Sequence, residues 1–221
     1  MKATLTEVYG RLYATYGPQC WWPADSLFEV IVGAILTQST AWRNVQQALS
    51  NLKSAGVLSP QGLKEITKVD LATLLRPSGY FNVKAQKLKA FTEYLWEHYQ
   101  GDIKRLIKQD VVSLRKGLLS VYGIGEETSD AIILYAADKP SFVIDSYTRR
   151  IVKRLDLIKN TATYREHQNY FQRTIPIDTK LYNEFHALMV RHGQQVCKRK
   201  PLCEKCCLLD VCPWGIIKTG N

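Results

Sequence analysis

Apolar residues recur at helical spacing along almost the whole chain, and no alternating pattern is long enough to form a sheet. Residues 27–36 are apolar nearly all round, as in a buried central helix, and Asp25 or Ser26 could cap its start. Residues 83–99 and 181–192 predict amphipathic helices, and residues 141–144 are the one short β-like run. Glycine and proline divide the chain into helices of ordinary length. The sequence therefore predicts an all-α fold, a helical barrel plus a second helical lobe that carries most of the cysteines.

The chain is strongly basic, with a net charge of +10 over 221 residues. A surplus of this size favours a polyanionic partner, because neutralising phosphates releases counterions. The alternative is a basic surface that is merely solvated. No apolar run is long enough to span a membrane, and the polar N-terminus lacks the apolar stretch of a secretory signal. We expect a cytoplasmic protein with no membrane partner, associated with the nucleoid if it is bacterial.

A Gly-x-Gly hairpin, Gly123-Ile124-Gly125, lies between predicted helices at residues 114–121 and 127–137. Glycines let a backbone approach a phosphate closely, and the start of the second helix exposes unpaired N–H groups. Ile124 would pack inward and hold the turn. A plain interhelical turn is the alternative for the motif by itself.

A single acid, Asp145, follows the hairpin at the end of the apolar run 142–144. A carboxylate there can face a nucleotide whose phosphates bind the hairpin. The alternative is a helix N-cap for the residues that follow, and capping N–H groups would help to keep the carboxylate ionised, so both roles can hold.

The hairpin LSVYGIGEETSDA (119–131) and the acid segment FVIDSY (142–147) resemble the helix-hairpin-helix DNA glycosylase superfamily, whose best-known member is endonuclease III. The resemblance implies a six-helix barrel over residues 22–136, with the helix-hairpin-helix at about 114–137. Residues 1–21 and 137–221 would form a second helical lobe, with the active site in the cleft between the two. It also implies a monovalent cation at the hairpin, a monomer that binds damaged double-stranded DNA, and Asp145 as the catalytic aspartate.

The chemistry agrees with that role for Asp145. Breaking a glycosidic bond develops positive charge on the sugar, which a nearby carboxylate stabilises while it orients or activates water. In strand-cleaving members of the superfamily a lysine attacks the sugar, but Glu127 stands at the matching position. Lys116 and Lys139 do not match it. The resemblance therefore predicts a glycosylase of base excision repair that uses water and has no lyase activity.

Two further segments are similar to the 3-methyladenine glycosylases of the endonuclease III type, Trp21-Trp22-Pro23 and the region up to Trp42. That branch builds an aromatic base pocket there, and electron-rich indoles attract a cationic alkylated purine. Core packing is the alternative for these tryptophans. The same resemblance implies that Gln38, Tyr80 and Phe81 fill the gap left by the flipped base, with interhelical packing as the alternative for the two aromatics.

Five of the six cysteines lie within residues 197–212, where clustered thiols indicate a metal site rather than disulfides. This loop resembles the iron–sulfur loop of endonuclease III. The resemblance implies a [4Fe–4S] cluster held by Cys197, Cys203, Cys206 and Cys212, although the first gap is one residue shorter than usual. Cys207 could replace Cys206, and zinc is the alternative metal. The exposed charges of Lys198, Arg199 and Lys200 would then contact phosphates.

Two other functions stay open at this point. One is an endonuclease III-type enzyme that acts on oxidised pyrimidines and cleaves the strand. The other is a protein that binds DNA structures through the hairpin without chemistry.

Overall fold

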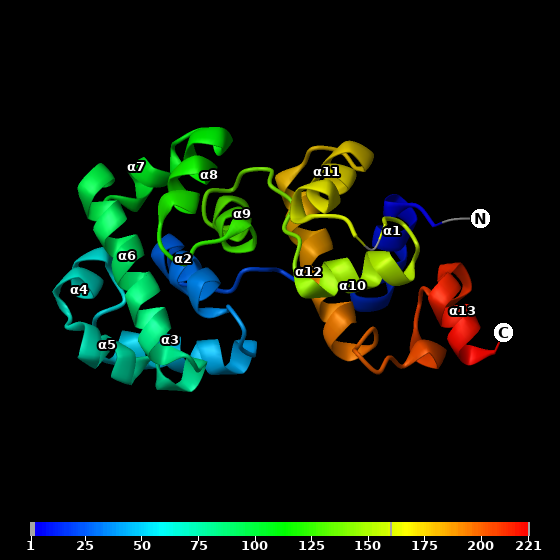
Figure 1. Ribbon diagram of the computed structural model, residues 1–221, viewed down its shortest axis with the longest axis horizontal. Helices are drawn as coiled ribbons and strands as arrows, with labels where there is room; N and C mark the ends of the chain where they lie inside the picture. Colours follow the sequence, from blue (N-terminus) through cyan, green and yellow to red (C-terminus); the bar gives the residue numbers. More distant parts are fainter. Residues whose placement is uncertain (1–2, 160, 221) are drawn as a thin grey trace. The chain divides into compact units, whose positions relative to one another are not determined.

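The computed structural model describes residues 3–159 and 161–220, and within these ranges every regular element is a helix (Figure 1). The all-α prediction is confirmed. The chain divides into two compact units, which we call the cysteine unit (Met1–Trp21 with Pro140–Asn221) and the hairpin unit (Trp22–Lys139).

The division after residue 139 falls three residues later than the sequence suggested, since residues 137–139 were expected in the second lobe. The reason is Lys139, whose ammonium group donates to the backbone carbonyls of Ile107 and Gln109. These bonds attach residues 137–139 to the hairpin unit and satisfy carbonyls at the end of a short helix.

The hairpin unit is built around one buried helix. Its elements are α2 (Leu27–Leu36), α3 (Trp42–Ser54), α4 (Pro60–Glu65), α5 (Lys68–Leu74), η1 (Arg76–Ser78), α6 (Phe81–Tyr99), α7 (Ile103–Ile107), α8 (Val111–Ser120) and α9 (Glu126–Tyr135). Helix α2 is buried from Phe28 to Leu36 and packs against α3, α6 and α9. Ser26 caps it by accepting from the backbone N–H of Glu29, whereas Asp25 pairs with Lys53 at 2.7 Å.

A buried lysine on α6 connects this helix to α2 and η1. Lys84 is 2% exposed, and its ammonium group donates to the carbonyls of Leu36, at the end of α2, and of Ser78 in η1. Burial lowers the pKa of Lys84 to about 8. The lysine thus satisfies a helix end that would otherwise be buried with an unpaired carbonyl.

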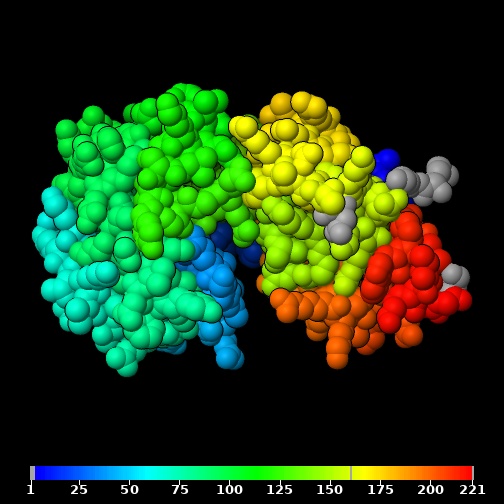
Figure 2. Space-filling view, viewed as in Figure 1, coloured from blue at the N-terminus to red at the C-terminus, as the bar shows by residue number. Residues whose placement is uncertain are grey.

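The cysteine unit contains α1 (Leu5–Tyr16), α10 (Ser146–Arg154), α11 (Tyr164–Thr174), α12 (Thr179–Gln195), η2 (Cys203–Lys205), η3 (Leu209–Val211) and α13 (Pro213–Thr219). Helix α12 packs against both α1 and α10. An aromatic core lies beneath them, in which the Phe142 and Phe171 rings stack at 4.1 Å. Figure 2 shows the cysteine loop, in orange, beside α13 in red.

None of the helices in the described part of the chain combines the length and the apolar character that a bilayer crossing requires.

Candidate functional site

The predicted hairpin joins α8 to α9. Gly123 adopts φ +81°, a left-handed conformation that favours glycine, and Ile124 is 4% exposed and packs inward as predicted. Gly125 caps α9 without a side-chain hydrogen bond, and a Cβ atom added there would meet nothing within 4 Å. The backbone at Gly125 is therefore open to a ligand, with the first-turn N–H groups of α9 beside it.

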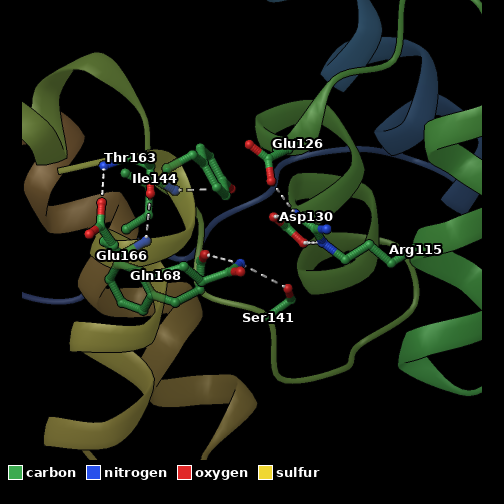
Figure 3. A network of polar contacts seen from close by, with 10 residues as sticks. Arg115, Glu126, Asp130, Ser141, Ile144, Thr163, Glu166 and Gln168 are labelled. Carbon is green, nitrogen blue, oxygen red and sulfur yellow. Dashed lines mark hydrogen bonds and ion pairs between the residues drawn. The ribbon is translucent and has the colours of Figure 1, made fainter.

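A buried ion pair fixes the two helices of the hairpin (Figure 3). The Arg115 guanidinium on α8 donates to both carboxylate oxygens of Asp130 on α9, at 2.9 and 3.1 Å, and to Glu126 at 3.2 Å. Asp130 is fully buried, and its hydrogen bonds raise the pKa of Arg115 above the usual value. Because the pair links the helices directly, it holds the turn between them in one geometry.

Gln38 was expected to fill the gap that a flipped base leaves in the duplex. In this structure its side chain contacts the hairpin. Its amide nitrogen donates to the Gly123 carbonyl and to the Thr128 hydroxyl, both at 2.9 Å. Its amide oxygen accepts from the Lys87 ammonium group, whose stem covers Gly123 so closely that an added Cβ would lie 2.4 Å from it. The role of Gln38 as a wedge stays a prediction, and the structure adds a role in bracing the turn.

The two aromatics expected beside Gln38 differ in exposure. Tyr80 is 73% exposed and adopts φ +46°, so interhelical packing does not account for it. Phe81 is half-buried, and the Arg76 guanidinium lies 5.7 Å from its ring centre. Insertion of these side chains into DNA stays a prediction.

The β-like run at residues 141–144 belongs to no regular element, and no strand is present among the described residues. Side chains of α11 replace the missing strand (Figure 3). Gln172 accepts from the Phe142 N–H at 3.0 Å, and Gln168 donates to the Phe142 carbonyl at 2.9 Å. The Tyr164 hydroxyl lies 3.4 Å from the Ile144 nitrogen, which donates to it. These contacts fix the backbone that leads into Asp145.

Asp145 is the N-cap of α10, as one of its two predicted roles required. Its Oδ1 accepts the Thr148 N–H at 2.7 Å, and the residue is 8% exposed. The other oxygen, Oδ2, lies 3.8 Å from Nε2 of His186 on α12. Sequence reasoning missed this neighbour, because nothing in the local pattern around His186 indicates which distant loop it meets.

Burial lowers the pKa of His186, and the Asp145 carboxylate opposes that shift. Only 5% of the residue is exposed. The imidazole is therefore neutral near pH 7, and no full positive charge is placed on Asp145 by its neighbour.

The adjacent tryptophans of the predicted base pocket belong to different units. Trp21 lies in the cysteine unit, with its ring centre 6.1 Å from that of His186. Trp22 lies in the hairpin unit and meets Trp42 edge-on at 5.2 Å. Pro23 is exposed. Their place in a base pocket stays a prediction, with core packing as the alternative.

A third aromatic, Tyr135 at the end of α9, joins Trp22 and was not predicted. The two rings meet edge-on at 5.2 Å. Trp22 also lies against Gly33 of α2, where an added Cβ would approach its ring to 3.3 Å. The glycine in α2 is explained by this close approach. A glycine within an otherwise apolar helix was the sequence signal that could have indicated a close aromatic neighbour.

Four cysteines line one cavity in the cysteine unit, together with Arg154 and Trp214; they are Cys197, Cys203, Cys206 and Cys212. Cys207 is not among the lining residues, and its carbonyl accepts from Arg11 at 3.4 Å. Across residues 3–159 and 161–220, no three histidine, cysteine or acidic side chains are arranged around a single metal ion.

Nitrogen atoms surround the sulfurs of this cavity. Arg154 Nη1 lies 3.1 Å from Cys197 Sγ, and the Gly215 N–H donates to Cys212 Sγ at 3.4 Å. N–H donors stabilise thiolate ligands and are typical of the surroundings of iron–sulfur clusters. The four thiols that the resemblance assigns to a cluster thus line one cavity, with nitrogen donors beside Cys197 and Cys212, and the cluster itself stays a prediction.

Arg154 also fixes the backbone of the basic loop. It donates to the carbonyls of Lys198 at 2.7 Å and Arg199 at 3.1 Å, and its guanidinium stacks 4.4 Å from the Trp214 ring centre. The side chains of Lys198, Arg199 and Lys200 remain exposed. The loop thus presents three positive charges from a fixed backbone.

Glu127 lies exposed in the first turn of α9, at the position that the resemblance matches to a lysine. Lys139 is committed to the carbonyls that end α7. The described hairpin region thus places a carboxylate, and no amine, at the matching position.

Residues 32–176 match the family described as HhH-GPD superfamily base excision DNA repair protein. The chain belongs to this family. Within it, a candidate DNA repair glycosylase of Methanocaldococcus jannaschii is 42% identical over 93% of this chain and 94% of its own length. The endonuclease III of Sulfolobus acidocaldarius is 29% identical over 89% of this chain and 86% of its own.

Among solved structures, the Helicobacter pylori 3-methyladenine DNA glycosylase bound to 1,N6-ethenoadenine superimposes with a TM-score of 0.76. It is 28% identical, and the match covers 87% of this chain and 98% of that one. This HhH-GPD protein is therefore a DNA repair glycosylase with the endonuclease III-like fold.

Proposed function

We propose that the protein removes alkylated purines such as 3-methyladenine from double-stranded DNA by hydrolysis and leaves the abasic strand intact. The observation that carries the proposal is the surroundings of Asp145. One of its oxygens is held by a backbone N–H, and its neighbour His186 is a neutral imidazole rather than a cation. Such a carboxylate keeps its negative charge for a substrate.

The chemistry follows from that charge. As the glycosidic bond lengthens, the sugar becomes cationic, and a buried carboxylate stabilises this charge more strongly than solvent does. Asp145 would also orient the water that adds to the sugar. An alkylated purine already carries positive charge and departs with less assistance than a neutral base, which suits a site with one aspartate.

The aromatic set of the hairpin unit supports the choice of lesion. The Trp22 ring meets the Trp42 ring and the Tyr135 ring edge-on, each at 5.2 Å, so electron-rich rings gather at one place in this unit. A cationic purine gains roughly 1–3 kcal/mol from stacking on such a ring. The likeness to the 3-methyladenine glycosylase of Helicobacter pylori agrees with this choice.

Hydrolysis without strand cleavage rests on Glu127. A carboxylate cannot form the imine through which a lysine cleaves the strand. In the first turn of α9 an acid is instead favourable for the helix dipole.

The cysteine loop would hold a [4Fe–4S] cluster through Cys197, Cys203, Cys206 and Cys212. When bound, the cluster would crosslink the loop and could exchange an electron. The chain's own contribution is to present the basic residues 198–200 from a backbone that Arg154 fixes. A monovalent cation at the hairpin, a monomeric state and a cytoplasmic location are further expectations of the same proposal.

The test is base release from duplex DNA treated with a methylating agent, with products separated by chromatography beside duplexes that carry oxidised pyrimidines. We expect 3-methyladenine to be released by the native protein and not by Asp145→Asn, which should still bind DNA. Borohydride should trap no protein–DNA adduct.

Each of the following results would overturn a different part of the proposed function. Release of oxidised pyrimidines together with borohydride trapping would show an endonuclease III-type enzyme. Release at full rate by Asp145→Asn would remove the aspartate from the mechanism. Binding without release of any base would show a protein that recognises DNA structure only.

A further inference from the structure

Beyond Asp145 itself, we infer that His186 is a positioning residue that sets the orientation of the Asp145 carboxylate through its free oxygen, Oδ2. The inference rests on the proposed role of Asp145 and adds a residue from a different helix. His186 is not among the residues that line the cysteine cavity, and the reaction as described above leaves it unused.

The geometry divides the two oxygens of Asp145 between two helices. Oδ1 is bound to the Thr148 N–H at 2.7 Å, at the start of α10. Oδ2 faces Nε2 of His186, on α12, at 3.8 Å. The cap restrains rotation about the Cβ–Cγ bond through one oxygen only, so a contact at Oδ2 fixes the plane of the carboxylate more firmly.

Both side chains are held where they are. Asp145 is 8% exposed and His186 is 5% exposed, and α10 packs closely against α12. The Trp21 ring, 6.1 Å from the imidazole between ring centres, adds a further wall to the same site. A separation of 3.8 Å exceeds a hydrogen bond, and catalytic contacts often shorten only when substrate binds.

A neutral imidazole suits this task better than a cation. A neutral N–H donor can orient Oδ2 without placing a positive charge beside it, so the negative charge of the carboxylate stays available to the cationic sugar. A protonated His186 would neutralise that charge. Burial opposes protonation, and Asp145 is the charged group that favours it.

Two substitutions separate positioning from simple packing. His186→Gln keeps an N–H donor within reach of Oδ2, whereas His186→Leu fills much of the same space without one. We expect His186→Leu to lower the single-turnover rate of base release from methylated duplex DNA by about 10- to 100-fold. His186→Gln should recover a large part of that loss, and the dissociation constant for DNA should stay unchanged in both.

The matched control is His167→Leu. His167 is also buried, at 4% exposed, and lies in the same unit, but its Nδ1 contacts the Thr163 carbonyl rather than Asp145. This variant should lose thermal stability while its rate per folded molecule stays native. Circular dichroism and the melting temperature report folding for all three variants.

The pH profile supplies a readout that a packing defect does not move. In the native protein, protonation of His186 removes the usable charge of Asp145, so part of the fall in rate at acid pH, below the ordinary histidine range, belongs to this histidine. We expect that part to be absent in His186→Gln.

The outcomes are distinguishable from failure of the proposed function. If Asp145→Asn abolishes release while His186→Leu is folded and fully active, the inference about His186 is wrong and the proposed function stands. If Asp145→Asn keeps full activity, the proposed function fails first. If His186→Gln is as slow as His186→Leu and keeps the native pH profile, the effect is packing and the inference is again wrong.

Discussion

Two buried aspartates, one in each unit, have opposite surroundings. Asp130 in the hairpin unit is fully buried and paired with the Arg115 guanidinium through two hydrogen bonds. Asp145 in the cysteine unit is almost as buried, yet its neighbours are a backbone N–H and a neutral imidazole. A carboxylate whose charge is compensated by a cation can support structure, whereas one with only neutral groups beside it has its charge available for a reaction.

The largest effect on stability is expected at Asp130, the aspartate whose charge is paired with Arg115. Arg115→Met removes the cation that pairs with the buried Asp130 carboxylate, which should lower the free energy of unfolding of the hairpin unit by about 3–5 kcal/mol. Urea unfolding followed by tryptophan fluorescence measures it. Combining Arg115→Met with Asp130→Asn should recover part of the loss, since the buried charge is then gone. A loss below 1 kcal/mol for the single variant would contradict the structural role of the pair.

The next largest effect is expected at the turn between α8 and α9, which the Arg115–Asp130 pair supports. Its two glycines are there for different reasons. Gly123→Ala should cost about 1–2 kcal/mol, since it forces a left-handed conformation on alanine and displaces the Lys87 stem. Gly125→Ala should leave stability nearly unchanged, because a lower unfolded-state entropy offsets a weaker cap. The same change should weaken DNA binding on the order of tenfold, as measured by fluorescence anisotropy. Equal stability losses at both positions would contradict this difference.

The neutral surroundings of Asp145 predict a pH dependence of stability. Burial lowers the pKa of His186, so between its folded value and about 6.5 the unfolded chain binds a proton that the folded protein does not. This contribution is present above about pH 6.5 and is lost as the pH falls below it. His186→Leu should therefore reduce the loss of stability between pH 6.5 and 5.5 by up to about 1 kcal/mol. Urea midpoints across this range measure it, and identical slopes would show that the imidazole titrates normally.

The smallest effect on stability is expected at Asp145 itself. Asparagine caps helices about as well as aspartate, so Asp145→Asn should change the free energy of unfolding by less than about 0.5 kcal/mol. Base release should nevertheless be abolished. The same urea experiment checks the first part. A stability loss comparable to that of Arg115→Met would mean that the two aspartates are not different in kind.

Local patterns predicted much of the fold. The caps at Ser26 and Asp145 followed from a short polar residue before helix formers, and the inward packing of Ile124 from its place between two glycines. Each of these features depends on residues within one turn of a helix. The helix bounds also agree closely, with α6 beginning at Phe81 instead of residue 83.

Contacts between distant segments were not predictable in the same way. His186 meets Asp145, Gln38 meets Gly123, and Tyr135 meets Trp22 only because separate helices pack together. No spacing along the chain encodes such contacts. The β-like run was misleading for a related reason, since residues 141–144 are buried but belong to no strand, and helix α11 supplies the hydrogen bonds that a strand would have supplied.

That arrangement has a consequence for anyone who recombines members of the family. The backbone that precedes Asp145 forms hydrogen bonds with three side chains of α11, those of Tyr164, Gln168 and Gln172. None of these residues belongs to a recognisable motif. A graft that transfers the aspartate segment into another scaffold therefore has to carry α11 with it. Without this helix, the transplanted loop would keep its sequence but lose the hydrogen bonds that fix its backbone conformation.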